Sequence, residues 1–277
     1  MTFLPGYDPS AAKATGGRTV TRGLSPKLWR NVRPELAPLG GNFQMFSDWY
    51  NWVNITPTTA ASTTADTTNN QCTFTNNTDN DGQLIKASSI AGAPGDILAL
   101  DSEGGADEEG CQAQFQKQGL TPRDGYDIYF EARVALSDIA TAPDTFVGLA
   151  SSDTTVMTAA SATPTATDFT GFYTNASTSL LFGNDVDVTA TSIHTLLDHA
   201  TSTVTSEAFV KVGFVLRGTQ DGGEYYINGV SQSEVITWAA AANAVMYPSF
   251  ACLATAAVDS IMYIDWYAIA QWETAGQ

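Results

Sequence analysis

The chain has 277 residues, of which 43% are hydrophobic, and its formal net charge at pH 7 is −17. This composition supports a sizeable folded core, and no apolar run approaches the ~18 residues that a membrane-spanning helix needs. The first residues carry neither a basic nor an apolar leader region, so no secretory signal and no membrane partner are expected. Three buried thiols, at Cys72, Cys111 and Cys252, are favoured over a Cys72–Cys111 disulfide.

The charge is divided unevenly along the chain. Residues 1–38 hold six basic and two acidic residues, a net charge of +4, whereas the other 239 residues hold six basic and 27 acidic residues, a net charge of −21. An acidic body repels phosphates, so nucleic acid is not expected as a partner. The basic part is either a tail without fixed structure or a segment that docks on an acidic neighbour.

The N-terminal part of the chain contains one segment with helical signals. Residues 1–23 show no hydrophobic periodicity, and no fixed element is expected there. A Ser-Pro pair at positions 25 and 26 suits the start of a short helix over residues 26–32. The apolar residues on one face of this helix are Leu28, Trp29 and Val32. Trp29 then packs either on the body of its own chain or on another subunit, and the sequence leaves both alternatives open.

The composition changes at Gly40, which divides the chain into an arm of residues 1–40 and a body of residues 41–277. The aromatic segment 42–53 is expected to open the body, and residues 72–75 form the next predicted strand. The acidic loops 79–82 and 101–109 lack the spacing of an EF-hand, so solvated loops are favoured over a calcium site.

The clearest strand pattern in the middle of the chain is the segment 127–136. One face of this strand carries Ile128, Phe130, Ala132, Val134 and Leu136, and the other carries Asp127, Tyr129, Glu131 and Arg133. Further strands are predicted at 146–150, 169–173 and 179–182. Residues 193–200 suit a short helix or an irregular strand. Their two histidines, His194 and His199, do not have the i, i+4 spacing of a helical zinc site, and no metal is predicted.

The C-terminal third of the chain predicts an antiparallel meander. Residues 209–217 alternate between apolar and polar positions, and residues 224–227 form the returning strand after a glycine-rich turn. The dipeptide Asn228-Gly229 is typical of a type I′ turn, in which both central residues have positive φ. The segment 260–270 is apolar on both faces and suits a central strand. Its one charge, Asp265, is expected to be hydrogen-bonded.

These C-terminal strands, together with residues 248–250, resemble the concanavalin A-like (laminin G-like) jelly roll. In particular, they resemble the copies carried by structural proteins of tailed-phage virions. The resemblance covers residues 43–273. It implies an all-β jelly-roll β-sandwich with an extended basic N-terminal arm. It also implies a virion structural protein, first a capsid decoration (cement) protein and next a head or tail fibre, made in the host cytoplasm and placed on the capsid surface.

The resemblance also implies the partners of the chain. These are the major capsid protein or other virion subunits, bound through the arm and an edge of the sandwich, with further copies of the chain forming a homo-oligomer on the particle. The arm residues expected to contact the partner are Phe3, Leu4, Tyr7, Lys13, Arg18, Arg22, Lys27, Leu28, Trp29, Arg30 and Arg33.

Two other functions are weighed against this one. A lectin-like module would bind a glycan, and the aromatic residues suited to stack on sugars are Trp49, Tyr50, Trp52, Tyr173, Tyr225 and Tyr226. A glycan-cleaving enzyme is the remote alternative, because the Glu-x-Asp-x-x-Glu string of concanavalin-like glucanases is absent. Asp127 and Glu131 would lie about 13 Å apart along one strand, too far for a catalytic carboxyl pair. No enzymatic activity and no cofactor are therefore predicted.

Overall fold

A computed structural model describes part of the chain. The described residues are 23–32, 43–47, 63–65, 72–76, 83–87, 97–102, 110–116, 118–137, 143–158, 164–175, 179–186, 199–203, 208–219, 223–232, 245–255 and 260–274. Within these ranges no helix is long and apolar enough to cross a membrane. Strands supply nearly all of the regular structure, which confirms the prediction of an all-β fold.

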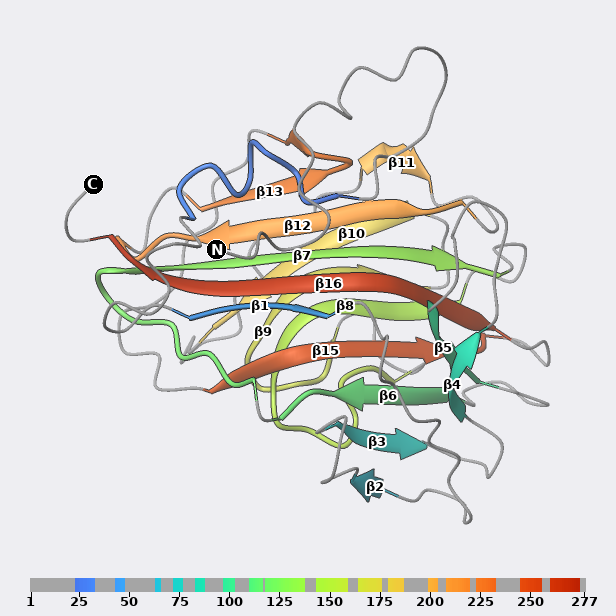
Figure 1. Ribbon diagram of the computed structural model, residues 1–277. Helices are drawn as coiled ribbons and strands as arrows, with labels where there is room; N and C mark the ends of the chain where they lie inside the picture. Colours follow the sequence, from blue (N-terminus) through green and yellow to red (C-terminus); the bar gives the residue numbers. More distant parts are fainter. Residues whose placement is uncertain are drawn as a thin grey trace, which may run out of the picture.

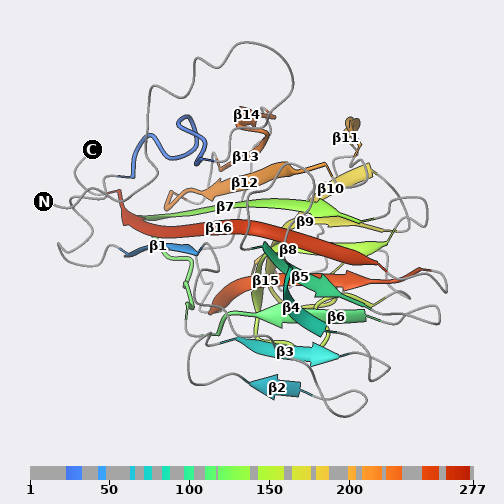
Figure 2. The ribbon, with the colours of Figure 1, turned by 45° about the vertical axis from the view of Figure 1, so that its right-hand side comes forward.

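The strands form two antiparallel sheets that face each other (Figures 1 and 2). In spatial order, the first sheet contains β14 (Val230–Ser231), β13 (Glu224–Ile227), β12 (Val210–Leu216), β7 (Tyr126–Leu136), β16 (Ile261–Glu273), β5 (Ile97–Asp101) and β4 (Gln83–Ala87), and β1 (Phe43–Ser47) also pairs with β16. The second sheet contains β11 (His199–Thr203), β10 (Ser179–Asp185), β9 (Phe169–Thr174), β8 (Asp144–Ser151), β15 (Met246–Leu253), β6 (Gly110–Gln114), β3 (Thr73–Asn76) and β2 (Thr63–Ala65).

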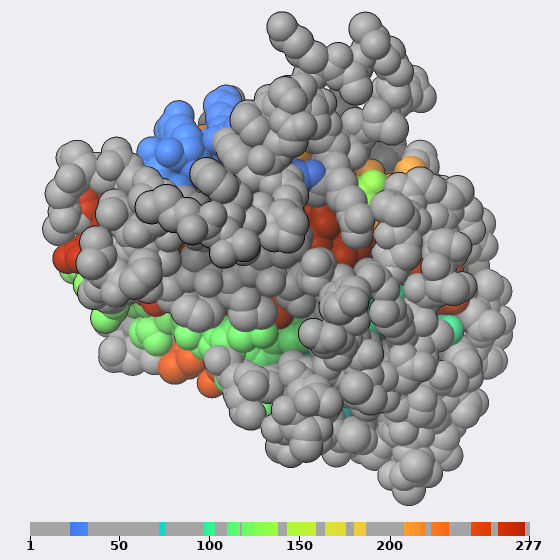
Figure 3. Space-filling model, viewed as in Figure 1, coloured from blue at the N-terminus to red at the C-terminus, as the bar shows by residue number. Residues whose placement is uncertain are grey.

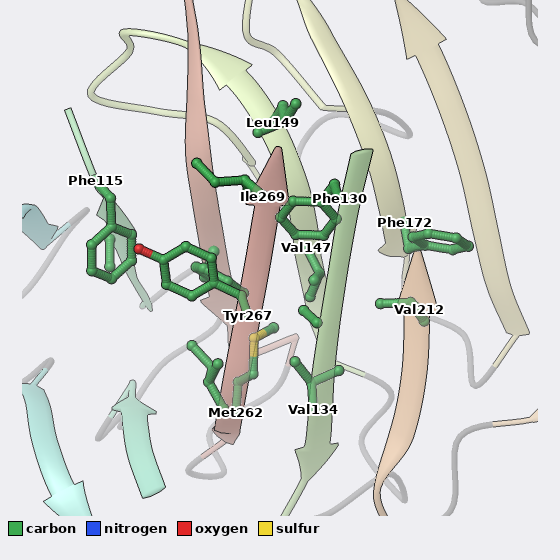
Figure 4. Close-up of a cluster of buried hydrophobic side chains, with 14 of the residues drawn as sticks. Phe115, Phe130, Val134, Val147, Leu149, Phe172, Val212, Met262, Tyr267 and Ile269 are labelled. Atoms are coloured by element: carbon green, nitrogen blue, oxygen red, sulfur yellow. The ribbon is translucent and has the colours of Figure 1, made fainter. Parts of the chain in front are cut away.

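The hydrophobic core lies between the two sheets. All five residues predicted for the apolar face of β7 are in it, from Ile128 to Leu136. Figure 4 shows Phe130 and Val134 of β7, Tyr267 of β16 and Phe172 of the second sheet among the side chains of this core. Phe130 stacks on Phe214 of β12 with ring centroids 5.2 Å apart. The alternation in the sequence therefore identifies the inner face of β7 correctly, because successive side chains of a strand point to opposite faces.

The predicted meander is confirmed in β12, β13 and β14. Asn228 and Gly229, between β13 and β14, have φ values of 51° and 77°. These values confirm the turn with two positive φ angles that the Asn-Gly dipeptide indicated.

The prediction of buried thiols is also confirmed. Cys72, Cys111 and Cys252 are all buried, and no disulfide joins them. The strands predicted at 146–150, 169–173 and 179–182 correspond to β8, β9 and β10. Of the segment 42–53, the described part is the strand β1; most of the acidic loops and His194 lie outside the described residues.

Strand β16 changes face at Asp265, a feature that the sequence pattern did not reveal. Ile264 pairs with Val134, and Trp266 pairs with Arg133, so Asp265 is the extra residue of a β-bulge. Residues before the bulge face the core through Met262 and Ile264, whereas residues after it do so through Tyr267 and Ile269. Asp265 is fully buried and accepts a hydrogen bond from the Arg133 guanidinium. This bond confirms that Asp265 is hydrogen-bonded.

Candidate functional site

Residues 23–32, here called the anchor segment, lie on the outer face of the first sheet. Figure 1 shows this segment in blue next to β13 and β12, and Figure 3 shows it at the surface of the molecule. It covers side chains of β7, β12, β13 and β16, which are together called the anchor face: Tyr129, Glu131, Lys211, Gly213, Val215, Tyr226, Trp266, Ala268, Ala270 and Trp272. The jelly roll therefore carries a bound peptide segment of its own chain on the side away from its core.

Apolar side chains of the anchor segment are inserted into the anchor face. Leu28 and Trp29 are only 2% and 8% exposed, and Val32 is buried beside them. The rings of Trp29 and Tyr129 lie with their centroids 5.9 Å apart. Leu28 reaches the sheet at Gly213, where a β-carbon would come within 2.7 Å of the Leu28 Cδ2 atom. A glycine at this position therefore provides the space that Leu28 occupies.

Glu131 is the main polar contact of the anchor segment. This carboxylate is 1% exposed. It accepts hydrogen bonds from the Ser25 backbone N–H at 2.9 Å and from the Trp29 indole Nε1 at 2.8 Å. The Ser25 hydroxyl donates to its second oxygen. Three donors on one segment thus satisfy one buried carboxylate, as a buried charge requires.

Charges on the anchor face are balanced in a small cluster. Lys211 is buried, and its Nζ donates to the Gly23 carbonyl at 3.0 Å. Burial raises the pKa of Glu131, and the hydrogen bonds from Ser25 and the charge of Lys211 oppose that shift. Burial lowers the pKa of Lys211, and the charge of Glu131 opposes that shift in turn. Each charge therefore opposes the pKa shift that burial causes in the other.

A second carboxylate closes the far end of the anchor face. Asp127 accepts hydrogen bonds from Arg217 Nη1 at 2.8 Å, from the Gly218 N–H at 2.9 Å and from the Tyr129 hydroxyl at 3.0 Å. Asn31 of the anchor segment also hydrogen-bonds Tyr129. The carboxylates of Asp127 and Glu131 each have structural partners, and those of Glu131 belong to the anchor segment.

Two glycines allow the contact at Ser25 to be tested by a matched pair of substitutions. Gly125 and Gly229 both have φ of +77°, so alanine at either position should cost about 1–2 kcal/mol of stability. A β-carbon at Gly125 meets open space, whereas one at Gly229 would lie 2.9 Å from the Ser25 hydroxyl oxygen. Urea denaturation should therefore show a larger loss for Gly229→Ala than for Gly125→Ala. Equal losses would contradict the contact between Ser25 and the turn.

Buried tyrosines should make the protein sensitive to alkali. Burial and the hydrogen bond to Glu224 raise the pKa of Tyr226 to about 12, and burial raises the pKa of Tyr173 to about 12. Burial, followed by the charge of Asp127, also raises the pKa of Tyr129. The unfolded chain loses these protons near pH 10. The contribution of each protonated tyrosine to stability is thus complete below about pH 10 and is lost as the pH rises towards 12. Over that range the free energy of unfolding falls by ~1.4 kcal/mol per pH unit for each tyrosine.

The variant Tyr173→Phe provides the measurement, because the Tyr173 hydroxyl has no hydrogen-bond partner among the described residues. Urea denaturation at several pH values should give a shallower loss of stability above about pH 10 for the variant than for the unchanged chain. Identical slopes would show that Tyr173 does not keep its proton in the folded state.

The structure decides between the alternatives left open for Trp29. It packs on its own sandwich, where the first sheet of the same chain buries Leu28 and Trp29. The contact of these two residues with a partner stays a prediction. The short helix predicted over 26–32 is corrected, because these residues form turns. Trp29 N–H bonds the Ser25 carbonyl, but the Ser25 hydroxyl is directed to Glu131 and does not cap a helix.

The other predicted arm residues fall into two groups. Lys27 and Arg30 are exposed on the anchor segment. The rest lie outside the described residues, namely Phe3, Leu4, Tyr7, Lys13, Arg18, Arg22 and Arg33. The sequence reading missed the acceptor side of the site, above all Glu131 and Lys211. One available signal was the placement of these charges on strands whose other face is fully apolar.

The aromatic residues proposed for sugar stacking do not form an exposed platform where they are described. Tyr173, Tyr225 and Tyr226 are 1%, 0% and 2% exposed. Trp49, Tyr50 and Trp52 lie outside the described residues.

The outer face of the second sheet is also covered. The loop after β8 covers it with Val156 and Met157, which pack against Phe146, Phe169 and Tyr173. Gln112 of β6 holds this loop by accepting from the Val156 N–H at 2.6 Å and donating to the Asp153 carbonyl at 2.7 Å.

Comparisons of the fold place the chain among concanavalin A-like jelly rolls, in agreement with the expected fold class. Peanut lectin in complex with a nine-residue peptide superposes with a TM-score of 0.51 at 11% identity, over 83% of this chain and 97% of that one. A protein of unknown function from Shewanella oneidensis MR-1 gives 0.51 at 14% identity, over 85% and 89%. An endo-1,3-beta-glucanase from Streptomyces sioyaensis gives 0.48 at 11% identity, over 86% and 99%.

No family model matches the chain, and no curated protein matches it either. The structural similarity therefore establishes a lectin-like jelly-roll fold, and it shows the fold alone. Any function has to be argued from the residues of this chain.

Proposed function

We propose that this chain is a non-catalytic virion structural protein, a capsid decoration (cement) protein of a phage-like particle. It binds the major capsid protein through its N-terminal residues and an edge of the sandwich. The observation that carries the proposal is the anchor segment, which fixes the chain to the sandwich at residues 23–32 through Glu131, Leu28 and Trp29. Residues 1–22 are therefore connected to the body at Gly23, the first residue of the anchor segment.

Charge supports a docking role for residues 1–22. They contain three basic residues and one acidic residue, a net charge of +2, and the other 255 residues carry nine basic and 28 acidic residues, a net charge of −19. The exposed side chains of Lys27 and Arg30 extend this basic character along the anchor segment. A basic peptide next to an acidic body is directed to an acidic partner by electrostatic attraction, which weakens with salt.

The environment of three buried carboxylates on the strands of the first sheet supports a function without catalysis. Asp127, Glu131 and Asp265 are engaged by Arg217, by the anchor segment and by Arg133, respectively. A retaining or inverting glycosidase needs two carboxyl groups that face a substrate across a short gap. These three carboxylates instead hold strands and the anchor segment together.

A glycan-binding function is the second candidate, and the lectin-like fold is the observation in its favour. The burial of Tyr173, Tyr225 and Tyr226 removes half of the aromatic residues that this alternative used. A glycan array tests it directly. Saturable binding of one class of saccharide by the unchanged chain, in the absence of particle binding, would replace the decoration proposal with the lectin alternative.

The decoration proposal is tested by removing residues 1–22 and keeping the anchor segment. We expect this variant to have the melting temperature of the unchanged chain. It should no longer co-sediment with the phage-like particles of the organism that carries the gene. A full-length variant with Lys13, Arg18 and Arg22 replaced by glutamine is the matched control for charge. It should bind with at least tenfold lower affinity at low salt and with weaker salt dependence. Unchanged particle binding by the shortened chain would contradict the proposal.

A further inference from the structure

The anchor face has the properties of a peptide-binding site. The anchor segment forms no strand with the sheet beneath it, and its described backbone hydrogen bonds, such as that from the Trp29 N–H to the Ser25 carbonyl, are local. Its connections to the sandwich are hydrogen bonds with the side chains of Glu131 and Lys211 and apolar contacts on the outer face of the first sheet, with Leu28 and Trp29 at the centre of these contacts. The segment thus binds to the surface of the sheet, as a peptide ligand would, and is not one of its strands.

The polar contacts give this site selectivity for a particular peptide. Glu131 receives the Ser25 N–H, the Ser25 hydroxyl and the Trp29 indole, and Lys211 donates to the Gly23 carbonyl. Buried charges of this kind add little stability over an apolar contact, and their best-attested use is to fix register and partner choice. The side chains of the segment that make such selective contacts are those of Ser25, Leu28 and Trp29.

The connection between the anchor segment and the sandwich is long enough to reach a neighbour. Ten residues, 33–42, separate Val32 from Phe43, the first residue of β1. Extended chain spans about 3.3–3.6 Å per residue, so this connection covers up to roughly 35 Å. That reach is on the order of the diameter of a small domain.

We propose that the anchor segment of one chain docks on the anchor face of a second copy of the same chain, in exchange for that copy's own segment. The contacts are the same within a chain and between chains, so exchange loses none of them. A short connection holds the segment at an effective concentration on the order of millimolar, which favours the closed monomer in dilute solution. Exchange becomes favourable where copies are held side by side. The inference does not depend on a virion role.

Two full-length variants with complementary defects test the exchange. Leu28→Asp spoils the segment and leaves the anchor face intact, whereas Val215→Lys places a charge under the segment and leaves the segment intact. Each variant should be monomeric alone by light scattering. A mixture of the two at ~100 µM should form a complex of one copy of each. The intact segment of Val215→Lys can bind only to the intact anchor face of Leu28→Asp. The matched control, Leu28→Asp mixed with the unchanged chain, should form at least tenfold less complex.

A synthetic peptide of residues 23–32 verifies that the face of Leu28→Asp is open. It should bind that variant and displace the mixed complex, and a Trp29→Ala peptide should bind at least tenfold more weakly. A mixture that stays monomeric while the peptide binds would overturn the exchange. Failure of the peptide to bind the folded variant would also overturn it, since the anchor face would then not be a peptide site.

Discussion

Replacing Glu131 with alanine is expected to lower the free energy of unfolding by ~3–5 kcal/mol, the usual cost of removing one partner from a buried charge pair. The variant loses the acceptor of the Ser25 N–H, the Ser25 hydroxyl and the Trp29 indole, all of which are buried. It also leaves the buried Lys211 ammonium without the nearby negative charge that opposes the lowering of its pKa. Urea denaturation followed by circular dichroism measures the loss.

Glu131→Gln is the matched control for this prediction. The amide oxygen still accepts from the anchor segment, but the charge next to Lys211 is gone, so an intermediate loss is expected. Limited proteolysis adds a local measurement. Cleavage after Lys27 or Arg30 should be faster in Glu131→Ala, since the segment is released from the sheet more often. A loss below ~1 kcal/mol for Glu131→Ala would show that this carboxylate does not hold the segment.

Replacing Asp265 with leucine is expected to cost a similar ~3–5 kcal/mol, because Arg133 loses its buried carboxylate. Both side chains are buried, and the Arg133 guanidinium also lies 3.9 Å from the centre of the Phe209 ring. The effect falls on stability, since Asp265 lies in a bulge of a central strand.

A double-mutant cycle separates the ion pair from the bulge itself. Replacing both Arg133 and Asp265 with leucine removes both charges, and apolar replacement of a buried pair is often neutral or stabilising. The double variant should therefore be more stable than Asp265→Leu, with a coupling free energy of about 2 kcal/mol or more. If the losses of stability of Arg133→Leu and Asp265→Leu simply add up in the double variant, the carboxylate stabilises the bulge and not the ion pair.

Much of the fold was readable from the sequence because strands alternate their side chains. The inner face of β7 from Ile128 to Leu136 followed from a period of two, and the turn at Asn228-Gly229 followed from the φ values that only a few residues adopt readily. The bulge at Asp265 could not be found in this way. The segment around it is apolar on both faces, so a shift of one residue leaves the pattern unchanged.

The sequence by itself determined the class of fold and the strands of the meander. It also showed that the apolar side chains of Leu28, Trp29 and Val32 must pack against another surface. Only the tertiary structure decided where these side chains are buried. Leu28 and Trp29 fit the anchor face because β7 and β12 pair in a register that sets Gly213 opposite Glu131. That register places a space for Leu28 beside a carboxylate for Trp29. Residues more than 100 positions apart meet there, and no local pattern in the chain encodes such a meeting.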